Sequence, residues 1–224
     1  LTVRNLTLML NSTYMLFIAS VGVFFIMTMG SLDFSQGSML GVASIVVCVL
    51  SNYNIVLAII GGILSGMLVG AINAYFFVHR QIASFIVTNC TMFLLRGVVQ
   101  FLTNTPVMGA SYLQRDLWNM PLMIAITVIT LAIGYFVFTY TSLGAQLKAI
   151  GAGQTAARFA GVKVKKMQAL IYIVAGGLTG FAAFINCVKV GSVTSQSGTM
   201  LETHILIALV MGGMPISGGA ECRF

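Results

Sequence analysis

Four intervals of the sequence carry no charged side chain, and each is at least as long as a membrane-spanning helix. They are residues 5–32, 34–79, 117–147 and 167–188. A helix of about 20 apolar residues spans the hydrocarbon layer of a bilayer. Only 7% of the residues are charged and 58% are hydrophobic, whereas about a quarter of the residues in a soluble domain are charged. These features exclude an ordinary soluble domain and a disordered chain, and they predict a polytopic membrane protein.

Five apolar segments have the length of a full span, and two further segments are shorter. The long segments are residues 9–30, 57–78, 83–102, 119–140 and 168–187, and the short ones are residues 38–50 and 203–214. At a rise of 1.5 Å per residue, each long segment reaches across the bilayer as a helix. We therefore expect an all-α integral membrane protein, a polytopic helical bundle with about five full spans plus two short or broken helices. It forms a single transmembrane domain over residues 1–224.

Each short segment adjoins a run rich in Gly, Ser or Pro. Residues 30–38 precede the first short segment, and residues 212–219 follow the second. Irregular backbone at membrane depth persists only where protein buries it or where it lines a water-filled path, and discontinuous helices are common at transport sites. Both short segments are therefore expected to be discontinuous helices. Whether residues 31–56 cross the membrane or re-enter on the same side is open at this stage.

The basic residues predict the orientation of the chain. The net charge is +7, and five of the eleven basic residues lie in the loop 141–168, which has no acidic residue. By the positive-inside rule this loop is cytoplasmic. Counting spans backward places the turn at His79 and Arg80 on the same side, and the segments 103–118 and 188–202 on the other. The excess positive charge is therefore a topology signal, and we expect no nucleic-acid partner.

Small residues recur at helical spacing in two of the apolar segments. Gly62, Gly66, Gly70 and Ala74 follow one another every four residues, and Gly176 and Gly180 repeat the spacing later. Such ridges let helices approach closely in a bilayer, where lipid supplies no hydrophobic drive between helices. We interpret both ridges as helix-packing surfaces.

The basic loop contains a short pattern that resembles two kinds of site. Residues 151–156 match G-x-G-x-x-A, which is a dinucleotide fingerprint only within a βαβ unit, and no such unit fits between two spans. A short helix that begins after Thr155 as N-cap and ends at Gly161 suits the residues better. Its surface is expected to contact either a partner protein or anionic membrane lipid, and composition does not separate these two.

Two charged residues lie within apolar sequence. Asp33 adjoins the first broken segment, where its carboxylate is expected to accept backbone N–H groups freed by the interruption. We favour this structural role over substrate binding. Arg96 falls in the outer half of its helix and is expected to extend toward the interface as an anchor.

Metal-binding and catalytic motifs are missing from the sequence. Glu202 and His204 are two residues apart and so point to different faces of a helix, and no second histidine stands nearby. The four cysteines form no C-x-x-C pair and are expected to be buried small hydrophobes. The sequence contains no P-loop, G-x-S-x-G or kinase pattern. We therefore expect no metal site, no catalytic residue and no enzymatic activity.

Four blocks, in order, resemble the membrane permease subunit of carbohydrate-type ABC importers, the ribose/xylose/galactose group. Residues 31–38 resemble the family pattern I-D-L-S-V-G-S, and residues 71–74, 83–88 and 94–97 resemble its G-x-x-N-G, P-x-F-I-x-T-L and R-G series. The basic loop from Gly144 to Val162 resembles G-R-x-x-x-A-x-G-x-N-x-x-A-A-R-x-x-G-I. Residues 202–219 resemble E-L-D-A-I-A-A-V-V-I-G-G-T-S-L-x-G-G.

The resemblance implies a mechanism and a set of partners. A family permease pairs with a second copy or a homologue around one translocation path in the cell inner membrane. It receives a sugar or similar solute from a periplasmic or lipoprotein solute-binding protein, and an ABC ATPase subunit drives it. ATP is then used by the partner subunits, and this chain binds no cofactor. Alternating access would follow from rocking of the permease halves.

The resemblance also assigns roles to residues. It makes the helix in the loop 141–168 the element that couples to the ATPase, with Gly144, Gly151, Thr155, Ala156, Ala157, Arg158, Phe159 and Gly161. The residues expected at the broken helices and the translocation path are Asp33, Ser35, Gly37, Asn73, Glu202, Gly212 and Gly213.

The chain departs from the family pattern at four positions: Ala74 stands for Gly, Ala145 for Arg, Gln154 for Asn and His204 for Asp. Relatives carry a helix before the region of Leu1 and further helices after Gly219, so we expect a sequence incomplete at both ends or a decayed copy. Other functions considered are a nucleoside or branched-chain amino-acid ABC permease, and a stand-alone secondary transporter or channel with Asp33 as its ion or proton site.

Overall fold

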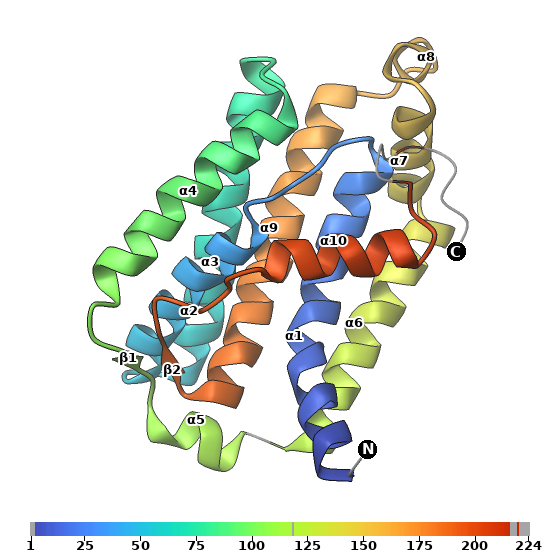
Figure 1. Ribbon diagram of the computed structural model, residues 1–224. Helices are drawn as coiled ribbons and strands as arrows, with labels where there is room; N and C mark the ends of the chain where they lie inside the picture. Colours follow the sequence, from blue (N-terminus) through green and yellow to red (C-terminus); the bar gives the residue numbers. More distant parts are fainter. Residues whose placement is uncertain (1–2, 118, 216–218, 220–224) are drawn as a thin grey trace.

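The computed structural model describes residues 3–117, 119–215 and 219, which form a helical bundle (Figure 1). The longer helices are α1 (Val3–Thr28), α2 (Gln36–Ser51), α3 (Ile55–Ala74), α4 (Ser84–Leu102), α6 (Met120–Tyr140) and α9 (Val164–Val190). The shorter ones are a π-helical turn η1 (Tyr75–His79) that continues α3, α5 (Ser111–Asp116), α7 (Ser142–Ala152), α8 (Gln154–Phe159) and α10 (Leu201–Met211). The strands are β1 (Val107–Met108) and β2 (Ser192–Val193).

The expected helical membrane protein is confirmed. Four helical segments are long and apolar enough to cross a bilayer, namely α3 with η1, α4, α6 and α9. They correspond to four of the five predicted spans. The fifth predicted span, residues 9–30, corresponds to α1, which is apolar from Thr13 to Thr28. The two predicted short helices are α2 and α10.

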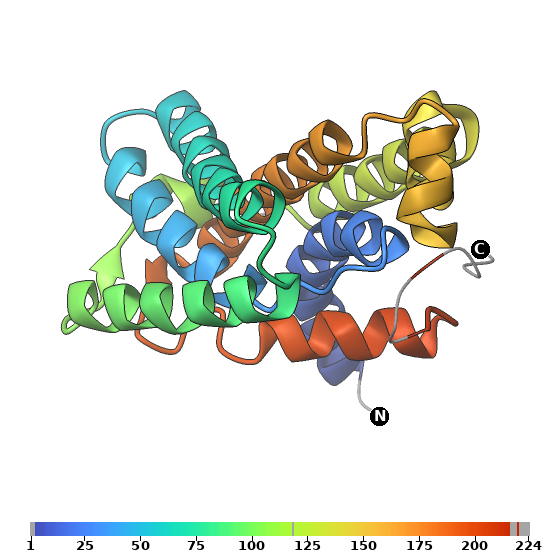
Figure 2. The ribbon, with the colours of Figure 1, turned by 90° about the horizontal axis from the view of Figure 1, so that it is seen from above.

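Helix α9 forms the centre of the bundle. In its most apolar stretch 72% of the residues are buried, against 28% in α3 with η1 and 22% in each of α4 and α6. Seen along the bundle, α9 lies between α3 on one side and α1 and α6 on the other (Figure 2). The outer helices present large apolar side chains such as Leu64, Phe93 and Phe136, each more than half exposed. This surface is suited to lipid.

The two predicted glycine ridges pack against each other. A Cβ atom added at Gly66 would overlap the backbone carbonyl of Gly176, and one added at Gly180 would overlap that of Gly62. At Gly70 an added Cβ would overlap the carbonyl of Tyr172. Helices α3 and α9 are therefore in backbone-to-backbone contact, which only glycine permits, and the prediction of helix-packing surfaces is confirmed.

The chain around the first broken helix crosses the bundle. After α1, residues 31–35 run as an extended segment back into the bundle, where α2 begins and continues to the opposite end (Figure 1). This route answers the question left open for residues 31–56. The second short helix, α10, does not cross. It lies across α1 near mid-height (Figure 1) and also contacts α2.

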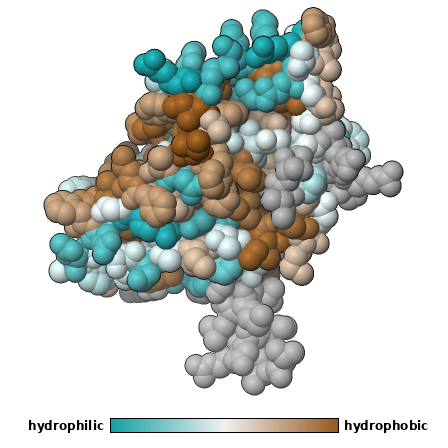
Figure 3. Space-filling model, turned by 45° about the horizontal axis from the view of Figure 1, so that its top comes forward, coloured by the Kyte–Doolittle hydropathy of each residue, from teal (hydrophilic) through white to brown (hydrophobic). Residues whose placement is uncertain are grey.

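The two ends of the bundle differ in chemistry. One end carries α7, α8 and the turn 80–83, and we call it the basic end. There Gln81 and Ala83 line the same groove as Arg158 and Lys165, so the turn and the basic loop meet as predicted. Hydrophilic side chains gather at this end, above a more hydrophobic band (Figure 3).

At the other end, which we call the ribbon end, β1 pairs antiparallel with β2, with Val107 opposite Val193. Residues 107–108 and 192–193 therefore share one end, as predicted, whereas residues 201 and 202 belong to α10, near mid-height (Figure 1).

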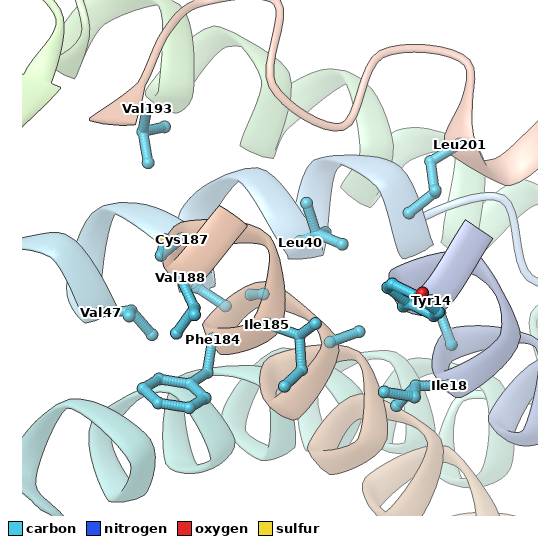
Figure 4. Close-up of a cluster of buried hydrophobic side chains, with 14 of the residues drawn as sticks. Tyr14, Ile18, Leu40, Val47, Phe184, Ile185, Cys187, Val188, Val193 and Leu201 are labelled. Carbon is cyan, nitrogen blue, oxygen red and sulfur yellow. The ribbon is translucent and has the colours of Figure 1, made fainter. Parts of the chain in front are cut away.

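Buried apolar side chains from α1, α2 and α9 interlock near the ribbon end (Figure 4). Cys48 and Cys187 belong to this cluster, and their sulfur atoms are 3.4 Å apart. Both are buried small hydrophobes, as predicted. For Cys90 the prediction is wrong, because its side chain is exposed on α4; Cys222 lies outside the described residues.

Candidate functional sites at the broken helices and the basic loop

Asp33 anchors the interrupted backbone before α2. Its Oδ1 accepts hydrogen bonds from the backbone N–H of Ser35 at 2.8 Å and from the Ser35 hydroxyl at 2.6 Å. Its Oδ2 accepts a bond from Gln36 Nε2 at 2.6 Å. Asp33 is 1% exposed, and charge-assisted hydrogen bonds of this kind offset the cost of burying a carboxylate. As predicted, the carboxylate holds a backbone N–H at the break.

The bonds around Asp33 extend to three further helices. Asn73 Nδ2 on α3 donates to Ser35 Oγ at 2.9 Å, and Thr91 Oγ1 on α4 donates to Asn73 Oδ1 at 2.7 Å. On α9, the Thr179 hydroxyl donates to Gln36 Oε1. We call these six side chains the Asp33 network. Sequence reasoning named Asp33, Ser35 and Asn73 and missed Gln36, Thr91 and Thr179, whose only signal was a polar side chain within an apolar helix.

The Asp33 network lies inside the protein. Asp33 is 1% exposed, and Ser35, Gln36, Asn73 and Thr179 are fully buried. Buried networks in which each member is hydrogen-bonded fix one arrangement of the surrounding elements. The network therefore joins the start of α2 to α3, α4 and α9.

Glu202 on α10 meets the same broken helix from the other side. Its Oε1 lies 3.2 Å from Arg96 Nη2 on α4. Its Oε2 lies against Gly37, where an added Cβ would overlap it, and this oxygen has no hydrogen-bond partner among the described residues. Glu202 is 6% exposed and Arg96 is 32% exposed.

The prediction that Arg96 anchors the chain at the interface is therefore wrong. An ion pair with a buried carboxylate is more favourable at membrane depth than a cation without a partner. The sequence did not pair the two residues because 106 positions separate them.

The remaining residues of α10 have other roles. His204 is exposed while Glu202 is buried, so the two point to different faces as predicted. Gly212 and Gly213 end the helix: the N–H of Gly212 bonds to Ala208 O, and Gly213 adopts a φ of 97°, which favours glycine. Both are exposed and lie at the opposite end of α10 from Glu202. The structure thus brings Glu202 to Gly37 but leaves these two glycines apart.

The basic loop is held to the bundle by two glycines. A Cβ added at Gly144 would overlap the backbone of Phe138, where the chain turns from α6 into α7. One added at Gly151 would overlap the carbonyl of Thr28 at the end of α1. Lys148 Nζ lies 4.3 Å from the centre of the Phe138 ring, a cation–π distance. These contacts fix α7 and thereby the position of α8.

Helix α8 projects beyond the bundle at the basic end (Figure 1). Ala157 is buried, at 2% exposed, whereas Phe159 is 90% exposed. Gly161 follows the helix with a φ of 84° and ends it as predicted. The predicted N-cap is wrong. Gly153 occupies that position because the helix starts at Gln154, which places Thr155 inside it.

Residues 151–156, which matched the dinucleotide fingerprint, span the junction of α7 and α8. The element that leads into them is the helix α7 and not a strand, so the dinucleotide interpretation fails on structure as well as on spacing.

An open basic groove adjoins α8. It has a volume of about 350 Å³ and is lined by Gln81 together with Arg158, Lys163, Lys165 and Lys166. Of α8 itself, Thr155, Ala156 and Arg158 are exposed. The described residues contain no group of three His, Cys, Asp or Glu side chains that would hold a metal ion. The basic end therefore presents an open surface lined by basic side chains.

Comparison with known proteins finds relatives that are named as permeases for sugars. The ribose import permease protein RbsC of Escherichia coli is 26% identical over 230 residues, which cover 97% of this chain and 72% of the relative. The L-arabinose ABC transporter permease protein AraH of Azospirillum brasilense is 28% identical over 227 residues, covering 98% and 67%. The xylose transport system permease protein XylH of Escherichia coli is 24% identical over 289 residues, covering 98% and 74%. No solved structure matches the chain.

A family described as "Branched-chain amino acid transport system / permease component" matches residues 5–220. The match includes both broken helices and the whole basic loop. The relatives are named permeases, in line with the transport subunit expected from the sequence. The chain therefore belongs to this family of multi-pass ABC transporter permeases.

Proposed function

We propose that this chain forms the translocation path of an ABC importer for a sugar. We further propose that α8 binds the ATPase and passes the movement of the ATPase on to this path. The observation that carries the coupling role is the exposure of Phe159, which is 90% exposed on α8, the helix that follows α7 and its close contacts at Gly144 and Gly151. A large aromatic side chain presented to solvent, beside basic residues, is typical of a protein-contact anchor. The three sugar permeases among the relatives support the solute class.

In this proposal the ABC ATPase binds at the basic end, which is cytoplasmic by the positive-inside rule. ATP is bound and used by that partner subunit. The ATPase binds to helix α8 and to the groove at Lys163 and Lys165. Movement of α8 passes to α7 and α1 through Gly151, which lies against the carbonyl of Thr28. Membrane lipid surrounds the apolar outer faces of α3 and α6.

The ribbon end then faces outward, toward a periplasmic or lipoprotein solute-binding protein. A second permease copy or a homologue completes the path in the inner membrane. The broken helices α2 and α10 line or frame this path, since irregular backbone at membrane depth belongs where solutes pass or where protein buries it.

Two other functions are less favoured. The family description names branched-chain amino acids, but the relatives compared above carry sugar names. A secondary transporter would use Asp33 as an ion or proton site. Against it, both carboxylate oxygens of Asp33 already accept hydrogen bonds, from the N–H and hydroxyl of Ser35 and from the amide of Gln36.

Uptake by proteoliposomes tests the proposal. The protein is reconstituted with its ATPase and solute-binding protein, and uptake of ribose, xylose and arabinose is measured with and without ATP. We expect ATP-dependent uptake of at least one pentose. Uptake that persists without ATP and collapses with an ion gradient would favour the secondary transporter, and uptake of leucine alone would favour an amino-acid permease.

A substitution at Phe159 tests the coupling role. Phe159→Ala is expected to weaken ATPase binding roughly 30-fold, because a central aromatic anchor contributes about 2 kcal/mol. Affinity is measured by titrating the ATPase onto the permease in nanodiscs. The matched control is Phe101→Ala, which removes a 77% exposed ring at the end of α4 and is expected to leave the affinity unchanged. Equal effects of both substitutions would contradict the assignment.

A further inference from the structure

A polar cavity opens toward the ribbon end, between the end of α9, residues 13–16 of α1 and the segment that leads from β2 into α10. Its volume is about 520 Å³, within the range of small-molecule sites. Thr194, residues 196–199 and His204 of α10 form one wall, and Asn186 and Lys189 of α9 form another. The cavity therefore lies beside the short helix α10, on the side opposite the ATPase-facing end.

Asn186 is the strongest sign that the cavity takes a ligand. Its side chain is 7% exposed and lines the cavity. Its amide makes no hydrogen bond with any described residue. Its nitrogen and oxygen are not among the enclosed side-chain atoms that lack a hydrogen-bond partner, so the amide faces the open cavity. A group that enters the cavity meets both the N–H donors and the oxygen of this amide.

The other polar side chains of the cavity wall can also form hydrogen bonds with a ligand of the same kind. Gln196 adds a second amide, Thr199 and Ser197 add hydroxyl groups, and His204 adds an imidazole. Each of these groups donates as well as accepts hydrogen bonds. Met15 and Leu16 of α1 supply an apolar side. No carboxylate lines the described wall, and Lys189 contributes the cationic side chain, so the cavity disfavours a cationic solute.

We infer that this cavity is the first site at which the permease contacts its solute, and that the solute is a neutral, polyhydroxylated molecule of monosaccharide size. The inference rests on the proposed importer function and adds the contact residues, with Asn186 and Gln196 as the hydrogen-bonding pair. Adjacent hydroxyl groups match an amide well, because one accepts from its N–H while the next donates to its oxygen. Because His204 belongs to α10, a solute bound in the cavity lies next to this helix, whose Glu202 contacts α2 and α4.

Two substitutions in the complete transporter test the inference. Asn186→Leu removes the buried amide, and Gln196→Leu removes an exposed one whose loss does not disturb packing. The matched control is Ser195→Leu, an exposed neighbour that is outside the described cavity wall. ATP-driven uptake of the pentose that the wild type transports is measured with saturating binding protein, together with the affinity of the permease for that binding protein.

We expect at least a tenfold loss of uptake for Asn186→Leu and Gln196→Leu, with unchanged affinity for the binding protein and normal uptake for Ser195→Leu. Normal uptake by Gln196→Leu and by folded Asn186→Leu would overturn the inference. Loss of binding-protein affinity would overturn it too, since the wall would then be a docking surface. Absence of uptake by the wild type would instead refute the importer function itself.

Discussion

At the scale of single residues, glycine decides how closely the helices meet. Gly66 and Gly176 each lie where an added Cβ would overlap the other's carbonyl oxygen. In a bilayer the gain from such contact is van der Waals packing, since lipid tails are as apolar as the helix surface. The ridge on α3 therefore fits only the ridge on α9, and this contact places α9 at the centre of the bundle.

Gly176→Ala is expected to lower the free energy of unfolding by about 1–3 kcal/mol, because the two backbones must move apart. The control is Gly97→Ala on α4, where an added Cβ meets no atom within 4 Å. It is expected to be neutral or stabilising by up to about 1 kcal/mol, since alanine favours helix. Thermal unfolding of the detergent-purified protein, followed by intrinsic fluorescence, compares the two. A smaller loss for Gly176→Ala than for Gly97→Ala would contradict the packing argument.

At the scale of elements, the short helix α10 is held at its start by contacts with two other helices. Glu202 contacts Gly37 at the first turn of α2 and pairs with Arg96 of α4 at 3.2 Å. The carboxylate also lies near the N-terminus of α2, where negative charge is favourable. One side chain thus ties α10 to two other helices, while Gly212 and Gly213 end the helix at its far end.

Removing one member of the Arg96–Glu202 ion pair is expected to lower the free energy of unfolding more than removing both members. Arg96→Leu leaves the buried Glu202 carboxylate without its cation and should destabilise the protein by about 3 kcal/mol, the lower end for a broken buried pair, because Arg96 is 32% exposed. The double variant Arg96→Leu/Glu202→Leu is expected to regain most of this loss. Unfolding measurements on both single variants and the double variant complete the cycle. Purely additive losses would show that the two charges do not interact.

At the scale of the whole molecule, the bundle has a basic end and a ribbon end, joined by helices with apolar outer faces. The turn 80–83 and the α8–α9 junction meet at one end, and β1 pairs with β2 at the other. By the positive-inside rule, we expect the basic end to face the cytoplasm and the ribbon end to face outward. The proposed coupling surface and the polar cavity lie toward opposite ends of the bundle, which fits the proposed importer.

Cysteine labelling tests this orientation. Lys163→Cys at the basic end and Gln196→Cys at the ribbon end both replace exposed residues. In intact cells, a membrane-impermeant maleimide is expected to label Gln196→Cys and not Lys163→Cys; inverted vesicles should show the reverse. Unsubstituted protein serves as the control for the exposed Cys90. Labelling of Lys163→Cys from outside would reverse the assignment of both faces.

Much of the candidate site was predictable. Asp33 and Phe159 were identified from local pattern, since a carboxylate beside a helix break and an aromatic residue in a basic loop are conspicuous in apolar sequence. Thr91, Thr179 and Gln36 were not identified, because the sequence around a lone polar residue in a helix does not show which distant residue is its hydrogen-bond partner. The same applies to Asn186, which sequence gives no reason to separate from other buried amides.

The sequence by itself determined which segments are helices and which end is basic, and it located both glycine ridges. Each of these depends on composition or on a period of a few residues, so neighbours along the chain carry the information. Only the tertiary structure decided that Arg96 pairs with Glu202, 106 positions away, and that Cys48 meets Cys187, 139 positions away. It also decided that residues 31–51 cross the bundle. These are outcomes of packing between distant helices, where polar groups buried from lipid must find partners on other helices.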